Sequence, residues 1–165
     1  MHSNVSHELE WKVYIEAAQT LERLGKTDKV VGYLSNAILS APDNIKWKLW
    51  LITSRIQMQM GENQSSRETI ERCCYEVPQK QVPTALMEYS KHFEMLGEED
   101  RAREIMDHAK RISKGEWKTH FEAVMFEIRT GSFKQAEEMV KASLEIYFAT
   151  GRLWATLVQL QNARS

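Results

Sequence analysis

Glutamate and histidine stand four residues apart at three places, the spacing that puts two side chains on one face of a helix. These pairs are Glu88 with His92, Glu104 with His108, and Glu116 with His120. Such a pair could ligate a metal ion or serve as an acid and a base. Because the pairs fall in different predicted helices and no third ligand converges on any of them, we interpret them as surface charge pairs, worth about 0.2–0.5 kcal/mol each.

The two cysteines, Cys73 and Cys74, are neighbours in the sequence. Adjacent cysteines rarely bridge each other and lack the spacing of a zinc site, so we expect neither a disulfide framework nor a bound metal. A reduced, packed state fits an intracellular protein. Arg72 beside them leaves a redox sensor as the alternative. The sequence also lacks a Gly-rich phosphate loop and a His-Glu-x-x-His motif, so we expect no enzyme and no cofactor.

Composition narrows the class of protein further. The 165 residues include 22 Lys and Arg against 23 Asp and Glu, which gives a net charge of -1. The overall charge therefore gives no reason to expect binding to nucleic acid or to a membrane. No stretch approaches 18 apolar residues, so no membrane association is expected. With only 7 Gly and 3 Pro, the protein has too few turn residues for a β-sandwich or barrel.

A repeat runs through the whole sequence. Four glycines, at 25, 61, 97 and 131, are separated by 36, 36 and 34 residues. The same kinds of residue recur around them: fourteen before, Trp11, Trp47, Pro83 and Trp117; eleven before, Tyr14, Trp50, Leu86 and His120; twelve after, the small Ala37, Cys73, Ala109 and Ser143. Tryptophans that recur at one repeat position predict packing between helices rather than stacking on nucleobases. Trp154, 37 residues after Trp117, begins a fifth unit.

Each unit predicts two helices joined at the glycine, which can take the left-handed conformation that ends a helix. Thr27 or Asp28 is expected to cap the helix that follows Gly25. The predicted helices span 8–24, 27–40, 44–60, 65–76, 83–96, 99–112, 115–130, 133–147 and 151–163. We therefore predict an all-α fold, a right-handed α-solenoid of antiparallel helix pairs in a single domain, 1–165. Its repeats are 8–42, 44–78, 83–113 and 115–149, followed by an unpaired helix, 151–163.

The pattern resembles the tetratricopeptide repeat (TPR), and more closely the half-a-TPR (HAT) repeat. The resemblance rests on the aromatic pairs that begin the first helices, on the stretch from Ala102 to Ala109, and on the closing prolines Pro42 and Pro78. Pro83 replaces the leading tryptophan, and Lys114 and Phe148 replace the closing proline, which leaves the choice between TPR and HAT open. The resemblance implies a scaffold of RNA-processing complexes, with the nucleus as the favoured compartment and the cytoplasm or an organelle as alternatives.

In a TPR-like solenoid the first helices line a concave surface that binds an extended partner. Counted from the glycines, the groove positions hold Lys12, Lys48, Thr84 and Lys118; Gln19, Arg55, Lys91 and Met125; and Arg23, Gln59, Met95 and Arg129. Seven of these twelve residues are basic, and we expect Glu22 and Glu94, at an adjacent position, to dilute that positive charge. The resemblance thus implies a groove for an acidic peptide, a C-terminal carboxylate or RNA phosphates. Ordinary solvation of the lysines is the alternative.

The last predicted helix forms the second candidate surface. It carries Trp154, Leu157 and Leu160, and its partner helix is missing. We expect this apolar face to continue into a longer repeat array or to dock on another protein or a second copy of the protein. The overall prediction is a non-catalytic protein–protein interaction scaffold, with a direct RNA-binding helical-repeat protein as the alternative.

Overall fold

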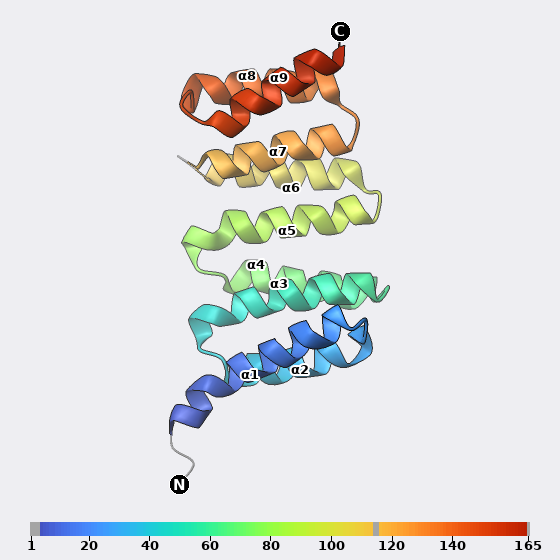
Figure 1. The fold of residues 1–165 in the computed structure, drawn as a ribbon, viewed down its shortest axis with the longest axis vertical. Coiled ribbons are helices and arrows are strands. Elements are labelled where there is room, and N and C mark those ends of the chain that lie inside the picture. Colours follow the sequence, from blue (N-terminus) through green and yellow to red (C-terminus); the bar gives the residue numbers. More distant parts are fainter. Residues whose placement is uncertain (1–3, 114–115, 165) are drawn as a thin grey trace. The chain divides into compact units, whose positions relative to one another are not determined.

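The computed structural model describes residues 4–113 and 116–164, which form nine α-helices and one short 3-10 helix, Gln79–Gln81, and no strand (Figure 1). The helices are α1 (Asn4–Arg23), α2 (Thr27–Ser40), α3 (Asp43–Gln59), α4 (Asn63–Glu76), α5 (Val82–Met95), α6 (Glu99–Ile112), α7 (Trp117–Arg129), α8 (Phe133–Ile146) and α9 (Gly151–Arg164). Apart from the start of α1, the predicted ends lie within two residues of these, except that the predicted start at 115 lies outside the described residues.

The protein divides into two compact units, Met1–His92 (unit 1) and Phe93–Ser165 (unit 2), and the boundary falls inside α5. Among the described residues, none of the helices is both long enough and apolar enough to cross a bilayer. The assignment of 1–165 to a single domain stays a prediction.

The four repeat glycines end helices in the same way. Each has a positive φ, from 74° at Gly25 to 83° at Gly131, which glycine adopts at little cost. At the first turn the Gly25 amide donates to the Glu22 carbonyl at 3.0 Å and the Lys26 amide to the Leu21 carbonyl at 2.9 Å, the two hydrogen bonds of a Schellman motif. The backbone therefore reverses within two residues, and a helix pair results.

The prediction that the side chain of Thr27 or Asp28 caps α2 is wrong. The N-cap residue of α2 is Lys26, and its side chain makes no capping hydrogen bond. The turn is so short that Thr27 and Asp28 already lie inside the first turn of α2, beyond the position from which capping is possible. Asp28 instead places a negative charge at the helix N-terminus, where it is favourable.

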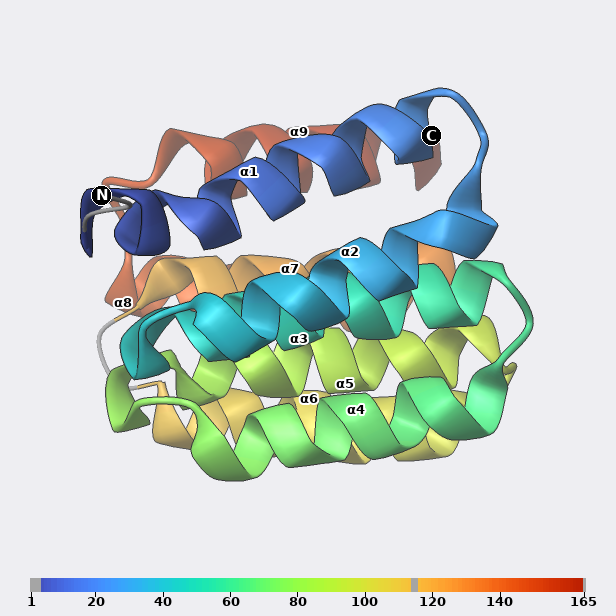
Figure 2. The same ribbon diagram turned by 90° about the horizontal axis from the view of Figure 1, so that it is seen from below.

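In unit 1 the core forms where small residues let helices approach. Ala37 is 0% exposed and packs with Ala41 and Leu49, and Trp11 and Tyr14 pack against this cluster. Cys73, also 0% exposed, packs with Trp47, Trp50, Ile70 and other buried residues in a second cluster. Figure 2 shows the hairpin of α1 and α2 from below. The packing prediction for the recurring tryptophans is confirmed for Trp47, which is buried, whereas Trp11 and Trp117 are half-buried and Trp154 is 48% exposed.

In unit 2 a cluster of buried side chains from α7, α8 and α9 comprises Val124, Ala136, Val140, Leu144, Leu153, Leu157 and Leu160. The predicted small positions are buried here too, at Ala109 and Ser143. Because α9 contributes three leucines to the cluster, it packs directly on the preceding pair. Burial of these side chains supplies the hydrophobic free energy that a single helix pair could not.

Candidate protein-interaction surface

Helix α3 exposes a narrow basic stripe. Between residues 45 and 58 the exposed residues are Lys48 and Arg55, and all others in this stretch are buried or half-buried. Two turns separate these cations, which is about 10 Å along the helix axis. Neither makes an ion pair with any described residue, although the Lys48 amine lies 5.6 Å from the centre of the Trp47 ring. Both charges of the stripe are therefore open to solvent.

Helix α1 carries two further cations at the predicted groove positions of unit 1. Lys12 and Arg23 are both exposed. The Lys12 amine lies 5.5 Å from the centre of the Trp11 ring, and Arg23 Nη2 donates to Thr20 Oγ1 at 3.4 Å. Neither residue is paired with a carboxylate among the described residues. We name Lys12, Arg23, Lys48 and Arg55 the α1–α3 basic surface.

Lys91, the groove position on the part of α5 that belongs to unit 1, differs from these four. It is half-buried, and its amine lies 3.5 Å from Glu88 Oε1. A partly exposed pair of this kind contributes little stability, but the carboxylate offsets the charge that Lys91 would offer to a partner. Lys91 therefore adds little to the α1–α3 basic surface.

In unit 2 the exposed residues of α7 are Lys118 and Arg129, the two predicted positions. Arg129 is neutralised: its Nε donates to Glu94 Oε1 at 2.7 Å and its Nη2 to Glu94 Oε2 at 3.1 Å. This bidentate pair raises the pKa of Arg129, mainly through the hydrogen bond to Glu94. Glu94 therefore neutralises the positive charge of Arg129. Of the two cations predicted on α7, Lys118 is the one without an ion pair to a described residue.

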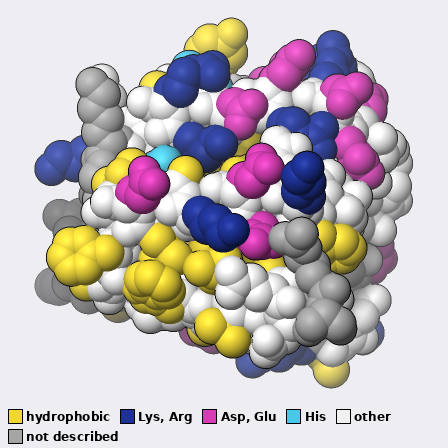
Figure 3. All heavy atoms as spheres, turned by 90° about the horizontal axis from the view of Figure 1, so that it is seen from above, with side chains coloured by type: hydrophobic (Ala, Val, Ile, Leu, Met, Phe, Trp, Pro, Cys, Tyr) yellow, Lys and Arg dark blue, Asp and Glu magenta, His cyan; other side chains and the backbone are white. Residues whose placement is uncertain are grey.

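The apolar face predicted on α9 is not open to a partner at Leu157 and Leu160. Leu157 is 8% and Leu160 5% exposed, because both pack into the core of unit 2 rather than towards a partner. Trp154 is 48% exposed, and its indole N–H donates to the Phe148 carbonyl at 2.6 Å. Val158 is also exposed. Figure 3, seen from above the α8–α9 end, shows hydrophobic side chains gathered beside mixed charges.

The structure shows where the side chains considered as metal ligands or as acid and base lie. No group of three or more His, Cys, Asp and Glu side chains that could hold a metal is found in the described part of the protein. The interpretation of Glu88 and His92 as a surface charge pair is wrong for His92, which is buried with its Nδ1 3.3 Å from Ser66 Oγ. His120 is half-buried, and its burial, with Lys110 nearby, lowers its pKa from the ordinary 6.5.

The cysteines are poor nucleophiles. Burial raises the pKa of Cys73 to about 12 and that of Cys74 to about 11. The Cys73 thiol also donates to the Trp47 carbonyl at 3.3 Å. These features argue against the redox-sensor alternative, because the thiolate is the reactive species.

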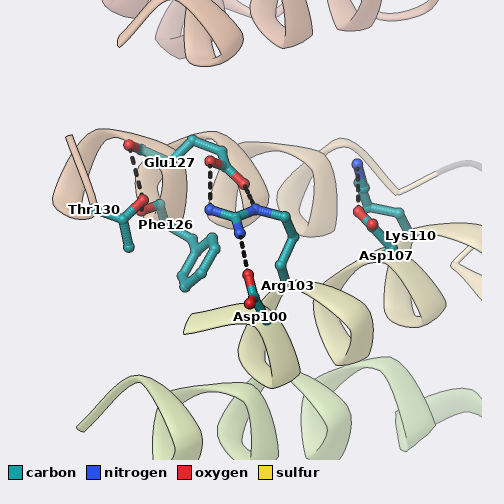
Figure 4. A network of polar contacts seen from close by, with 7 residues as sticks. All are labelled: Asp100, Arg103, Asp107, Lys110, Phe126, Glu127 and Thr130. Atoms are coloured by element: carbon teal, nitrogen blue, oxygen red, sulfur yellow. Dashed lines mark hydrogen bonds and ion pairs between the residues drawn. The ribbon is translucent and has the colours of Figure 1, made fainter. Parts of the chain in front are cut away.

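A buried ion pair that no sequence pattern predicts joins α6 to α7 in unit 2. Arg103 of α6 reaches the carboxylate of Glu127 on α7, whose side chain is 3% exposed, and Arg103 also pairs with Asp100 at 3.4 Å (Figure 4). The guanidinium lies 5.4 Å from the Phe126 ring centre. Arg103 and Glu127 are 24 residues apart, so no local spacing reveals the pair.

Residues 1–165 match the family model of the PRP6, TPR-like domain. The chain belongs to this family. A TPR-containing protein of Dictyostelium discoideum is 39% identical over 49 residues, which cover 30% of this chain and 4% of that protein. The match therefore spans only a small part of that relative.

Solved structures show the fold of this PRP6-family protein. A thermophilic TPR protein from Thermus thermophilus matches over 94% of this sequence and 83% of its own, with a TM-score of 0.62 and 16% identity. A Podosopora anserina structure of nearly identical TPR-like repeats matches over 93% and 86%, with a TM-score of 0.66 and 13% identity. The predicted fold class, an α-solenoid of TPR-like helix pairs, is confirmed.

Proposed function

We propose that this protein is a non-catalytic protein–protein interaction scaffold that binds an acidic segment of a partner on the α1–α3 basic surface. The observation that carries the proposal is the exposed stripe of α3, where Lys48 and Arg55 are the exposed side chains between residues 45 and 58. A cation without an ion-pair partner can make charge-assisted hydrogen bonds to a carboxylate. Acidic side chains of the partner and the carboxylate at its C-terminus can both accept such hydrogen bonds.

The surface favours a peptide over RNA as the partner. The net charge of the protein is -1, and Glu16 is exposed on α1 among the cations. A phosphate backbone carries a charge on every nucleotide and is held by runs of cations, whereas alternating charges suit a peptide with separate acidic positions. Direct RNA binding stays the alternative. The RNA-processing setting and a nuclear location belong to the proposal and rest on the HAT resemblance.

The experiment measures binding of two probes to the 165-residue protein. One is the acetylated, amidated peptide Glu-Asp-Glu-Leu-Glu-Asp-Glu, and the other is single-stranded oligouridine. We expect the peptide to bind and Lys48→Glu with Arg55→Glu to abolish binding, while Lys29→Glu with Lys80→Glu, an equal charge change at exposed positions elsewhere in unit 1, has a much smaller effect.

The oligouridine arm decides between the two ligand classes. Tighter binding of oligouridine than of the peptide, with the steep fall in affinity on adding salt that counterion release produces, would favour the RNA alternative. Equal loss of peptide binding in both double variants would remove the α1–α3 basic surface as the site. Circular dichroism of each variant verifies that the helices remain folded.

A further inference from the structure

A pocket of about 420 Å³ opens in unit 2 between α6, α7 and α8. Met139, Ala142 and Ile146 of α8 supply apolar lining, and His120 of α7 lies beside them. Its size is within the range of cavities that bind small ligands or single large side chains. The pocket is separate from the α1–α3 basic surface, and neither depends on the other.

The repeat register explains why this cavity exists. In the second repeat of unit 1 the position eleven residues before Gly61 is Trp50, which is 7% exposed, and the position eleven after is Arg72. The Arg72 guanidinium stacks on the Trp50 ring at 4.7 Å from its centre. In unit 2 the same two positions hold His120 and Ala142. Smaller side chains thus replace an indole and a guanidinium, and the volume is left open.

The polar groups of the pocket define what it would accept. Lys110 is paired with Asp107 at 3.2 Å, but Arg111 is exposed and makes no ion pair with a described residue. Ser143 is 5% exposed and lines the pocket, and its hydroxyl has no hydrogen-bond partner among the residues that the structure describes. An apolar wall with an available guanidinium at its side complements an aromatic side chain next to a carboxylate.

We propose that this pocket receives one aromatic side chain from an acidic segment of a partner protein, in the place that Trp50 occupies in unit 1. The aromatic ring packs against Met139 and Ile146, and a neighbouring carboxylate of the segment pairs with Arg111. Such a buried aromatic anchor with a charged neighbour has the composition of a binding hot spot. The α6–α8 pocket is therefore a second docking point of the scaffold.

The test uses the ¹⁵N-labelled 165-residue protein and the acetylated, amidated peptide Asp-Glu-Trp-Asp-Glu. We expect amide shift changes at the residues that line the pocket, and at least tenfold weaker binding of the same peptide with alanine in place of tryptophan. His120→Trp with Ala142→Arg introduces the side chains that Trp50 and Arg72 provide in unit 1. These should fill the pocket and weaken binding of the tryptophan peptide at least tenfold. Arg111→Glu should also weaken it, whereas Lys134→Glu, an exposed cation of α8 outside the pocket, should not.

Three results would overturn the proposal: no shift changes at the pocket with millimolar peptide, equal affinity for the tryptophan and alanine peptides, or unchanged binding after the pocket is filled. Should the double variant fail to fold, Ala142→Trp serves in its place, because Ala142 is exposed and an indole there covers the pocket without entering the core.

Discussion

Arg103 holds the buried carboxylate of Glu127 with two hydrogen bonds, from Nε to Oε1 at 2.8 Å and from Nη2 to Oε2 at 3.3 Å. The two residues lie on α6 and α7, so the pair ties the second helix of one repeat to the first helix of the next. The hydrogen bonds to Glu127 raise the pKa of Arg103 and keep it charged. A buried pair of this kind adds little net stability, because the cost of removing its charges from water offsets their attraction.

Loss of one partner should therefore cost more than loss of both. Arg103→Met leaves the Glu127 carboxylate, 3% exposed, without its cation, and should lower the free energy of unfolding by about 3 kcal/mol. Arg103→Met with Glu127→Met removes the stranded charge and should recover most of that loss. Urea unfolding of the four proteins in this cycle measures both effects. Additive losses in the double variant would contradict this explanation.

The buried thiols should be unreactive while the protein is folded. With a pKa of about 12, Cys73 is a thiolate in only about one molecule in ten thousand at pH 8. Iodoacetamide at pH 8 should therefore modify Cys73 and Cys74 slowly in buffer and rapidly in urea, with mass spectrometry as the readout. Fast alkylation of the folded protein would restore the redox-sensor alternative.

Two glycines of unit 1 should respond to alanine in opposite directions. Gly25 has φ 74°, so Gly25→Ala forces a strained backbone and should cost roughly 1–2 kcal/mol. Gly32 lies inside α2 with space around its Cα, so Gly32→Ala should stabilise by about 0.5–1 kcal/mol. Neither new methyl group meets another atom within 4 Å, so backbone conformation alone separates them. Urea midpoints that shift in the same direction would refute the conformational argument.

The pH dependence of stability should carry a contribution from His120. Its pKa in the folded protein lies below 6.5 because the ring is buried and Lys110 is near, so the unfolded state binds a proton first as the pH falls. Stability from the neutral imidazole is thus present above pH 6.5 and is lost as the pH falls from 6.5 to the folded pKa. The melting temperature should drop more between about pH 7.5 and about pH 5.5 in the wild type than in His120→Gln. An equal drop would show that other groups set the dependence.

The repeat made most of the fold predictable from the sequence. Gly25 and its three equivalents mark helix ends by a backbone requirement, and Ala37 and its equivalents mark close helix contacts by size, so both signals are local and periodic. The register of α9 was harder to predict. In the sequence of α9 alone, Leu157 and Leu160 fit an exposed apolar face. In the structure both pack with residues of α7 and α8 in the core.

The candidate surfaces were only partly predictable. Lys48 and Arg55, two groove positions found by repeat counting, are exposed in the structure, because position on a helix follows from the period; their role in binding stays a prediction. Counting could not show that Arg129 is neutralised by Glu94, since their contact joins residues 35 apart. The pocket beside His120 depends on volumes that several helices leave unfilled, which no single segment reveals.

Affinity capture from the native cell, with and without nuclease, tests the central claim most directly. The bait is the wild-type protein, Lys48→Glu with Arg55→Glu, or the matched Lys29→Glu with Lys80→Glu control. The proposed scaffold predicts nuclease-resistant partners that bind the wild type and the control but not the Lys48/Arg55 variant, all three baits having equal melting temperatures. Capture that nuclease abolishes, or that survives the Lys48 and Arg55 reversals unchanged, would contradict a protein-binding α1–α3 basic surface.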